Sequence, residues 1–106
     1  LIQFSSILSS MARTSDTVYR YGGEEFVVLL PNTNADGGLT LAERFREAIE
    51  KYDFDIGADA PIHISTSIGA AFFPEHGATM GQLFLAADKA LYKAKDSGRN
   101  CVEPAI

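Results

Sequence analysis

Apolar residues recur along this chain with periods that switch between helical and strand-like spacing. At the N-terminal end, Leu1, Phe4, Leu8 and Met11 follow helical spacing with serines between them, which predicts an amphipathic helix over Leu1–Ala12. No capping residue precedes this helix, and this pattern indicates that the chain opens in the middle of an element. We therefore expect the sequence to be an N-terminally truncated part of a single domain.

Two strand-like segments follow, and a pair of glycines separates them. Tyr19 and Tyr21 lead into Gly22-Gly23, and the apolar run Phe26–Leu30 leads out. A two-residue hairpin turn needs positive φ, which glycine adopts at little cost. Because both flanks are rich in aromatic and branched residues, the pattern predicts a β-hairpin.

An acidic pair, Glu24-Glu25, stands where the turn passes into the apolar strand. Side chains alternate along a strand, so we expect one carboxylate on each side of the sheet. A carboxylate at the tip of a rigid hairpin is well placed to hold a hard cation such as Mg²⁺. An ordinary solvated hairpin tip explains the same residues, and the local sequence leaves both interpretations open.

The rest of the chain predicts a second helix, a long strand, a third helix and a short last strand. A capping box, with Thr79 as N-cap and Gln82 three residues later, opens the third helix, and Gly98 closes it as a C-terminal cap. Gly69 interrupts the long strand, where we expect a bend. The elements are expected over Leu39–Tyr52, Ile62–Phe72, Thr79 to about Asp96, and Asn100–Glu103. Their predicted buried faces are Leu41, Ala42, Phe45, Ala48, Ile49 and Tyr52 on the second helix, and Leu83, Phe84, Ala87, Leu91 and Ala94 on the third.

Composition narrows the class of protein. The chain has 106 residues, 46% of them hydrophobic, as expected of one small globular domain. A net charge of −5 argues against a nucleic-acid partner, because no basic stripe is available to neutralise phosphates. The single cysteine, Cys101, excludes an internal disulfide, and His63 and His76 are expected to be structural or exposed. No signal peptide or membrane-length apolar run occurs in the sequence, so we expect a cytoplasmic setting without membrane contact in this segment.

Two motifs carry a family resemblance. The pentapeptide Gly22–Phe26 resembles the signature of the GGDEF-type diguanylate cyclases, in the variant with Glu at the third position. The segment Ala87–Asn100 reproduces a second signature of that family, Ala-Asp-x-Ala-Leu-Tyr-x-Ala-Lys-x-x-Gly-Arg-Asn, throughout. The resemblance covers nearly the whole chain and implies an α+β fold, with a βαββαβ palm-like, antiparallel-rich sheet flanked by helices as in nucleotide cyclases. The first central strand of that sheet is expected to be absent here.

The resemblance also implies an activity, which is condensation of two GTP molecules into cyclic di-GMP with release of pyrophosphate in bacterial signalling. Mg²⁺, or Mn²⁺, would assist, and two domains would face each other in a homodimer. The implied roles are metal ligand and candidate proton acceptor for Glu24, supporting catalytic carboxylate for Glu25, close backbone approach to the phosphates for Gly22 and Gly23, and phosphate contact for Lys95 and Arg99. Judged without the family resemblance, Lys95 and Arg99 would be ordinary partners of the dipole at the C-terminal end of a helix.

An Arg-x-x-Asp motif, Arg13 to Asp16, precedes the first signature. Taken alone it is most simply a local ion pair. In the resembled family, the same motif five residues before the first glycine forms an inhibitory site for the product. Arg44 matches a family arginine that joins this site from a neighbouring domain. The resemblance therefore implies product inhibition through these three residues.

Part of the family pattern does not occur in the sequence. The missing parts are a strand with a metal-binding Asp and a Phe-Lys-x-x-Asn-Asp stretch whose Asn contacts guanine. We therefore expect that these 106 residues alone do not catalyse and that a sensory or receiver domain lies upstream. Either the missing residues exist upstream and are not represented here, or the fragment assembles as a homodimer by pairing or swapping strands between chains. Two alternatives stay open: a non-catalytic GGDEF domain that senses GTP or cyclic di-GMP, and a structural dimerisation module. The intact acidic pair and the two C-terminal basic residues argue against degeneration.

Overall fold

The computed structural model describes residues 2–22, 25–52, 54 and 63–105. The chain divides into two compact units, Leu1–Thr33 and Asn34–Ile106, and each is described by itself. Most of the polar connection expected between the second helix and the long strand lies outside the described residues.

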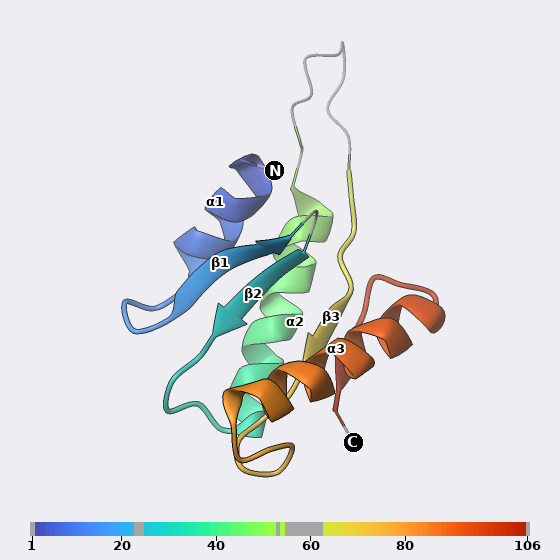
Figure 1. Cartoon of the computed structure of the whole chain (residues 1–106). Coiled ribbons are helices and arrows are strands. Elements are labelled where there is room, and N and C mark those ends of the chain that lie inside the picture. The colour runs from blue at the N-terminus through green and yellow to red at the C-terminus, as the bar shows by residue number, and fades with distance from the viewer. Residues whose placement is uncertain (1, 23–24, 53, 55–62, 106) are drawn as a thin grey trace. The chain divides into compact units, whose positions relative to one another are not determined.

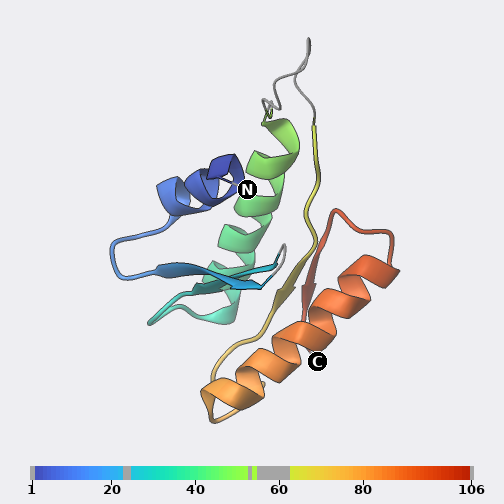
Figure 2. The same cartoon turned by 45° about the horizontal axis from the view of Figure 1, so that its top comes forward.

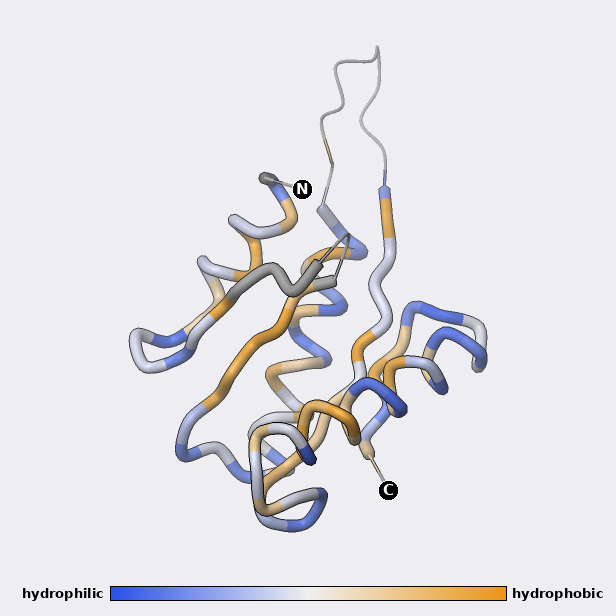
Figure 3. Tube along the Cα trace, viewed as in Figure 1, coloured by the Kyte–Doolittle hydropathy of each residue, from blue (hydrophilic) through white to orange (hydrophobic). Residues whose placement is uncertain are grey.

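The first unit is a helix on a β-hairpin (Figure 1). Helix α1 spans Ile2–Met11, within a residue of the prediction at each end. Strands β1 (Thr17–Gly22) and β2 (Glu25–Leu29) pair antiparallel, which confirms the hairpin. The rings of Phe4 and Phe26 stack with their centroids 5.1 Å apart, and Leu8 is buried. The part of β2 after Glu25 is apolar, and Figure 3 shows it as one continuous hydrophobic segment.

The second unit places a parallel strand pair between two helices. Its elements are α2 (Ala35–Lys51), β3 (Ile68–Ala70), α3 (Met80–Asp96) and β4 (Val102–Pro104). Because β3 and β4 run parallel, α3 is the crossover that connects them. Figures 1 and 2 show this pair of strands between α2 and α3. The α+β class is confirmed, and the described strands form two small sheets, one in each unit.

Helix α2 begins four residues earlier than predicted. Asn34 caps it, with its side chain accepting a 2.8 Å hydrogen bond from the Gly37 N–H, so the glycines expected in a loop form the first turn. Gly38 is buried there, and a Cβ on it would lie 2.5 Å from Cε1 of Phe72. At the other end, Tyr52 is the C-cap and is 39% exposed, so its assignment to the buried face was wrong.

Strand β3 is much shorter than the predicted strand. Among its described residues, Ile68–Ala70 alone pair, with the three residues of β4. Flanking bonds join Ile68 N–H to Cys101 O and Ala105 N–H to Ala70 O. Residues 63–67 have no regular structure, and position 62 lies outside the described residues. Gly69, where a bend was expected, allows a close approach to α3, since a Cβ there would lie 2.2 Å from Ala87 O.

Both predicted caps of α3 are present. The Thr79 side chain accepts from the Gln82 N–H, and the Gln82 side chain accepts from the Thr79 N–H. Gly98 follows the C-cap with φ of +109°, and the Arg99 N–H donates to Ala94 O at 3.1 Å, which is the hydrogen bond of a Schellman motif. The last strand starts two residues later than predicted, because residues 98–100 all have positive φ.

The buried apolar residues of the second unit come mostly from its two helices. On α3 only Ala90 and Ala94 are buried, whereas the other residues of its predicted buried face are half-buried. Ala90 was not predicted to be buried. The core of this unit is formed by Ala42, Phe45, Ile49, Phe54, Phe72, Ala90 and Ala94.

Candidate functional site

The first signature lies at the turn of the hairpin, with residues on both strands. Gly22 and Glu25 are register partners, and the pairing is irregular between Arg20 and Gly22. The intervening Gly23 and Glu24 lie outside the described residues, as does the side chain of Glu25. The structure thus supports the strand–turn–strand setting of the signature, and the roles of its carboxylates stay predictions.

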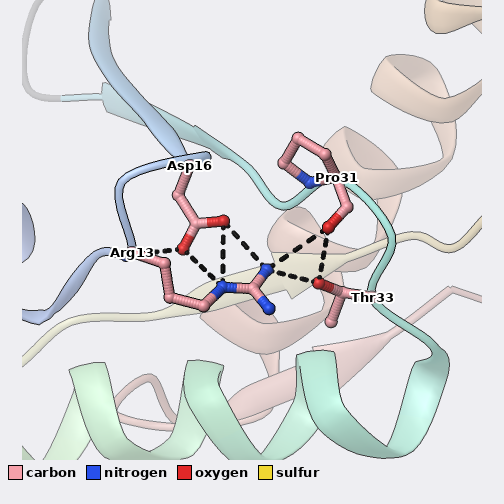
Figure 4. A network of polar contacts seen from close by, with 4 residues as sticks. All are labelled: Arg13, Asp16, Pro31 and Thr33. Atoms are coloured by element: carbon pink, nitrogen blue, oxygen red, sulfur yellow. Dashed lines mark hydrogen bonds and ion pairs between the residues drawn. The ribbon is translucent and has the colours of Figure 1, made fainter.

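Arg13 and Asp16 form a bidentate pair at the end of α1 (Figure 4). Nε of Arg13 lies 3.1 Å from Oδ2 of Asp16, and Nη2 lies 2.9 Å from Oδ1. The backbone completes the turn, because the Arg13 N–H donates to Oδ2 at 2.8 Å and the Asp16 N–H donates to the Arg13 carbonyl at 3.0 Å. The motif is therefore a preformed unit that holds a guanidinium beside a carboxylate.

This pair is also electrostatically matched. Hydrogen bonding to Arg13, followed by their mutual charge attraction, lowers the pKa of the Asp16 carboxyl. The same hydrogen bond raises the pKa of the Arg13 guanidinium. Both charged forms are thus favoured, and the Arg13 side chain remains 49% exposed.

Two further residues hold Arg13, and no local sequence pattern predicts either contact. Nη2 of Arg13 donates to Thr33 Oγ1 at 2.5 Å and to the Pro31 carbonyl at 3.4 Å, and Thr33 Oγ1 also donates to that carbonyl. All these contacts use Nε and Nη2, whereas Nη1 points away from the cluster in Figure 4. One edge of the guanidinium therefore stays available to a ligand.

Arg44, the third predicted member of the inhibitory site, is exposed on α2. It belongs to the second unit, whereas Arg13 and Asp16 belong to the first. The structure thus describes the Arg13–Asp16 pair as a cluster within the first unit and Arg44 as an exposed residue of the second.

Lys95 and Arg99 lie at the C-terminal end of α3, and both side chains are exposed. Lys95 is in the last helical turn, and Arg99 is in the turn that the Schellman hydrogen bond closes, with φ of +65°. The backbone of the second signature therefore carries two cations four residues apart into solvent at one helix end.

Within the part of the chain that the structure describes, no three acidic, histidine or cysteine side chains gather as a metal site. His63 is exposed, and the ring Nδ1 of His76 accepts a 2.8 Å hydrogen bond from the Phe72 N–H, which confirms that the histidines are structural or exposed. Cys101 is half-buried.

None of the described helices has the length and apolar character needed to cross a membrane.

Comparisons with known proteins agree with the motifs. The family described as "Diguanylate cyclase, GGDEF domain" matches residues 1–101. Diguanylate cyclase DgcM of Escherichia coli is 41% identical over 102 residues, which are 96% of this chain and 24% of that protein. The chain spans about a quarter of the length of the curated relatives it matches.

Solved structures show the same fold. The active GGEEF domain of a diguanylate cyclase from Vibrio cholerae superposes with a TM-score of 0.88 at 27% identity, covering 100% of this chain and 66% of that one. The coiled coil and GGDEF domain of DgcB from Caulobacter crescentus, in complex with c-di-GMP, gives a TM-score of 0.85 at 27% identity, covering 98% and 56%. With its hairpin, its Arg13–Asp16 pair and its capped α3 in place, the chain belongs to the GGDEF diguanylate cyclase family.

Proposed function

We propose that the protein containing this domain is a diguanylate cyclase that joins two GTP molecules into cyclic di-GMP. The observation that carries the proposal is that the first family signature occupies a β-hairpin and that the second ends at the C-terminus of α3, where the exposed cations Lys95 and Arg99 could meet phosphates. Membership of the family and the identity to DgcM support the same activity.

The chemistry consists of two nucleotidyl transfers. The 3′-hydroxyl oxygen of one GTP attacks the α-phosphorus of the other, and the bond between that phosphorus and the pyrophosphate oxygen breaks. The hydroxyl proton passes to a carboxylate, a role that we assign to Glu24. Repetition in the opposite sense closes the ring, so two GTP give one cyclic di-GMP and two pyrophosphates. The protein contributes mainly positioning and charge neutralisation.

The substrate phosphates would meet residues from both signatures. The glycines 22 and 23 lack a Cβ and allow the backbone to come close, and Glu25 supports the site as a second carboxylate. Lys95 and Arg99, which are exposed at the end of α3, would neutralise phosphate charge. Each domain holds one GTP, so the working form is a homodimer.

A hard divalent cation fits the donor set of the hairpin. Mg²⁺ binds through one or two carboxylates together with water and substrate phosphates, so a single protein carboxylate is a sufficient anchor. Glu24 would hold the Mg²⁺ or Mn²⁺ ion. When bound, the ion supplies neutralisation of the phosphates and a lower pKa for the attacking hydroxyl.

We also propose that Arg13, Asp16 and Arg44 bind the product and inhibit the enzyme. The Arg13–Asp16 pair is preformed, so little side-chain ordering is needed on binding. The Nη1 edge of Arg13, which none of the described contacts uses, can donate to a phosphate or guanine acceptor, while the covered Asp16 carboxylate holds the guanidinium in place.

The test is to incubate the full-length protein with GTP and Mg²⁺ and to separate the nucleotides by chromatography. We expect cyclic di-GMP and pyrophosphate in a ratio of one to two, and no product when a chelator removes the metal. Tight binding of GTP or cyclic di-GMP without turnover would instead support a sensory domain and contradict the proposal.

A further inference from the structure

A polar network joins the middle of α2 to the turn that follows α3. Nη1 of Arg46 donates to Asn100 Oδ1 at 3.0 Å, and Nδ2 of Asn100 donates to Glu50 Oε2. Nη1 of Arg46 also lies 3.7 Å from Glu50 Oε1, so the three side chains close a ring of contacts. Arg46 and Asn100 are 54 positions apart in the sequence, and the network is thus a tertiary connection.

Arg46 is the anchor of this network. Its side chain is only 15% exposed, and Nε donates to Glu43 Oε1 at 2.6 Å. Hydrogen bonding to Glu43 is the main cause that raises the pKa of Arg46, and the charges of Glu43 and Glu50 add to it. A nearly buried guanidinium that is fixed on its own helix makes a rigid donor for Asn100.

The turn that Asn100 belongs to has an unfavourable backbone conformation. Gly98, Arg99 and Asn100 have φ of +109°, +65° and +49°. Left-handed conformation is unfavourable for a non-glycine residue, and Asn tolerates it better than most because its short side chain can hydrogen-bond nearby. Such a turn persists only when its surroundings hold it in place.

Three sets of hydrogen bonds provide that support. Behind the turn, the Arg99 N–H bonds to Ala94 O at 3.1 Å, and ahead of it the Ile68 N–H bonds to Cys101 O at 2.9 Å. The side chain of Asn100 supplies the third, to α2. The backbone of Arg99 is therefore fixed on both sides, while its own side chain is exposed.

We propose that Arg46, Glu50 and Asn100 are positioning residues that hold the backbone of Arg99 so that its guanidinium meets a phosphate of GTP. This inference rests on the proposed function, because it assigns Arg99 to the phosphates. It also gives a role to Asn100, the last residue of the second signature, to which the proposed function assigns no phosphate contact. Without the network, the exposed cation would sample many positions and would bind phosphate at a greater entropic cost.

The decisive variant is Asn100→Gly in the full-length enzyme, because glycine accepts the positive φ and removes only the side-chain hydrogen bonds. We expect KM for GTP to rise roughly tenfold, as placement of a binding group is lost. In an Arg99→Ala background the same change should alter KM by less than about twofold, because the group it positions is already gone. Equal effects in both backgrounds, or a KM of Asn100→Gly within twofold of wild type, would overturn the inference.

Glu50→Ala and Glu47→Ala form a matched pair on α2. Glu50 bonds to Asn100, whereas Glu47 only approaches Arg46 at 3.9 Å, so we expect the first change to raise KM and the second to leave it unaltered. Equal kinetic effects of the two changes would contradict the network.

Hydrogen–deuterium exchange gives a readout that does not depend on activity. Asn100→Gly should speed exchange of the Arg99 amide, which bonds to Ala94 O, while amides in the middle of α3 keep their protection. Unchanged exchange at Arg99 would overturn the inference. If the wild-type enzyme made no cyclic di-GMP, or if Arg99→Ala left KM unchanged, the proposed function or its assignment of Arg99 would fail, and exchange would still decide whether the network holds the turn.

Discussion

Gly69 is the position at which the packing of α3 against β3 can be tested most sharply. A Cβ added there would lie 2.2 Å from Ala87 O and 2.3 Å from Leu91 N, both of which are backbone atoms of α3. Ordinary contact begins near 3.4 Å, so the helix would have to move away by about 1.2 Å in a close-packed interior. Gly69→Ala is therefore expected to separate the crossover helix from the strand beneath it.

The magnitude follows from two opposing terms. Overpacking typically costs about 1–3 kcal/mol, and a clash with two backbone atoms places this site at the upper end. The substitution also lowers the conformational entropy of the unfolded chain, because alanine has fewer accessible conformations than glycine, and this effect stabilises the folded protein by about 0.4–1 kcal/mol. A net loss of roughly 2 kcal/mol is expected, which lowers Tm by about 10 °C in a domain of this size.

The assay is thermal unfolding followed by circular dichroism, with Gly81→Ala as the matched control. Gly81 is an exposed residue of α3 whose added Cβ would find only Thr79 Oγ1, at 4.0 Å, so alanine there should stabilise by about 0.5 kcal/mol. A Gly69→Ala protein with the Tm of wild type would refute the close approach of α3 and β3. Because Lys95 lies in the last turn of α3 and Arg99 in the turn that follows it, the destabilised variant should lose GTP affinity as well.

Three further predictions follow from local contacts. Thr79→Ala removes the acceptor of the capping box and should lower the free energy of unfolding by about 1 kcal/mol, measured by urea denaturation, whereas no change would contradict the cap. Arg13→Ala should relieve inhibition of GTP turnover by cyclic di-GMP at least tenfold while uninhibited turnover persists, and inhibition equal to wild type would exclude this site. Hydrogen bonding to Arg13 lowers the pKa of Asp16, so its stabilising effect is complete above the unfolded pKa of about 3.9 and is lost as pH falls through the folded value. The Tm difference between wild type and Asp16→Asn should accordingly be constant near pH 7 and shrink below about pH 4; a difference that grew on acidification would contradict the pairing.

Features fixed by neighbouring residues could be predicted from the sequence. The capping box depends on contacts three residues apart, and the hairpin depends on a glycine pair between apolar strands, so both were predicted correctly. The start of α2 was missed because Gly37 and Gly38 favoured a loop, although the cap at Asn34 and a close contact with Phe72 favour helix.

Features that depend on distant residues could not be predicted. The length of β3 is limited by how many partners β4 offers, and the role of Gly69 depends on α3, which lies about 20 residues away in the sequence. The anchoring of Asn100 by Arg46 and the holding of Arg13 by Thr33 likewise join segments that no local pattern connects. The position of a motif was therefore readable from the sequence, whereas the residues that hold it in place were not.

The measurement that tests the central claim most directly is cyclic di-GMP synthesis by the full-length protein carrying Glu24→Gln. The substitution keeps the size of the side chain and removes its charge, so the fold, followed by circular dichroism, should persist. If the carboxylate holds the divalent cation and accepts the proton, turnover should fall by at least about 10²-fold, since removal of one such group typically has that effect. Turnover equal to that of the wild type would contradict the assignment of Glu24 and, with it, the proposed catalytic hairpin.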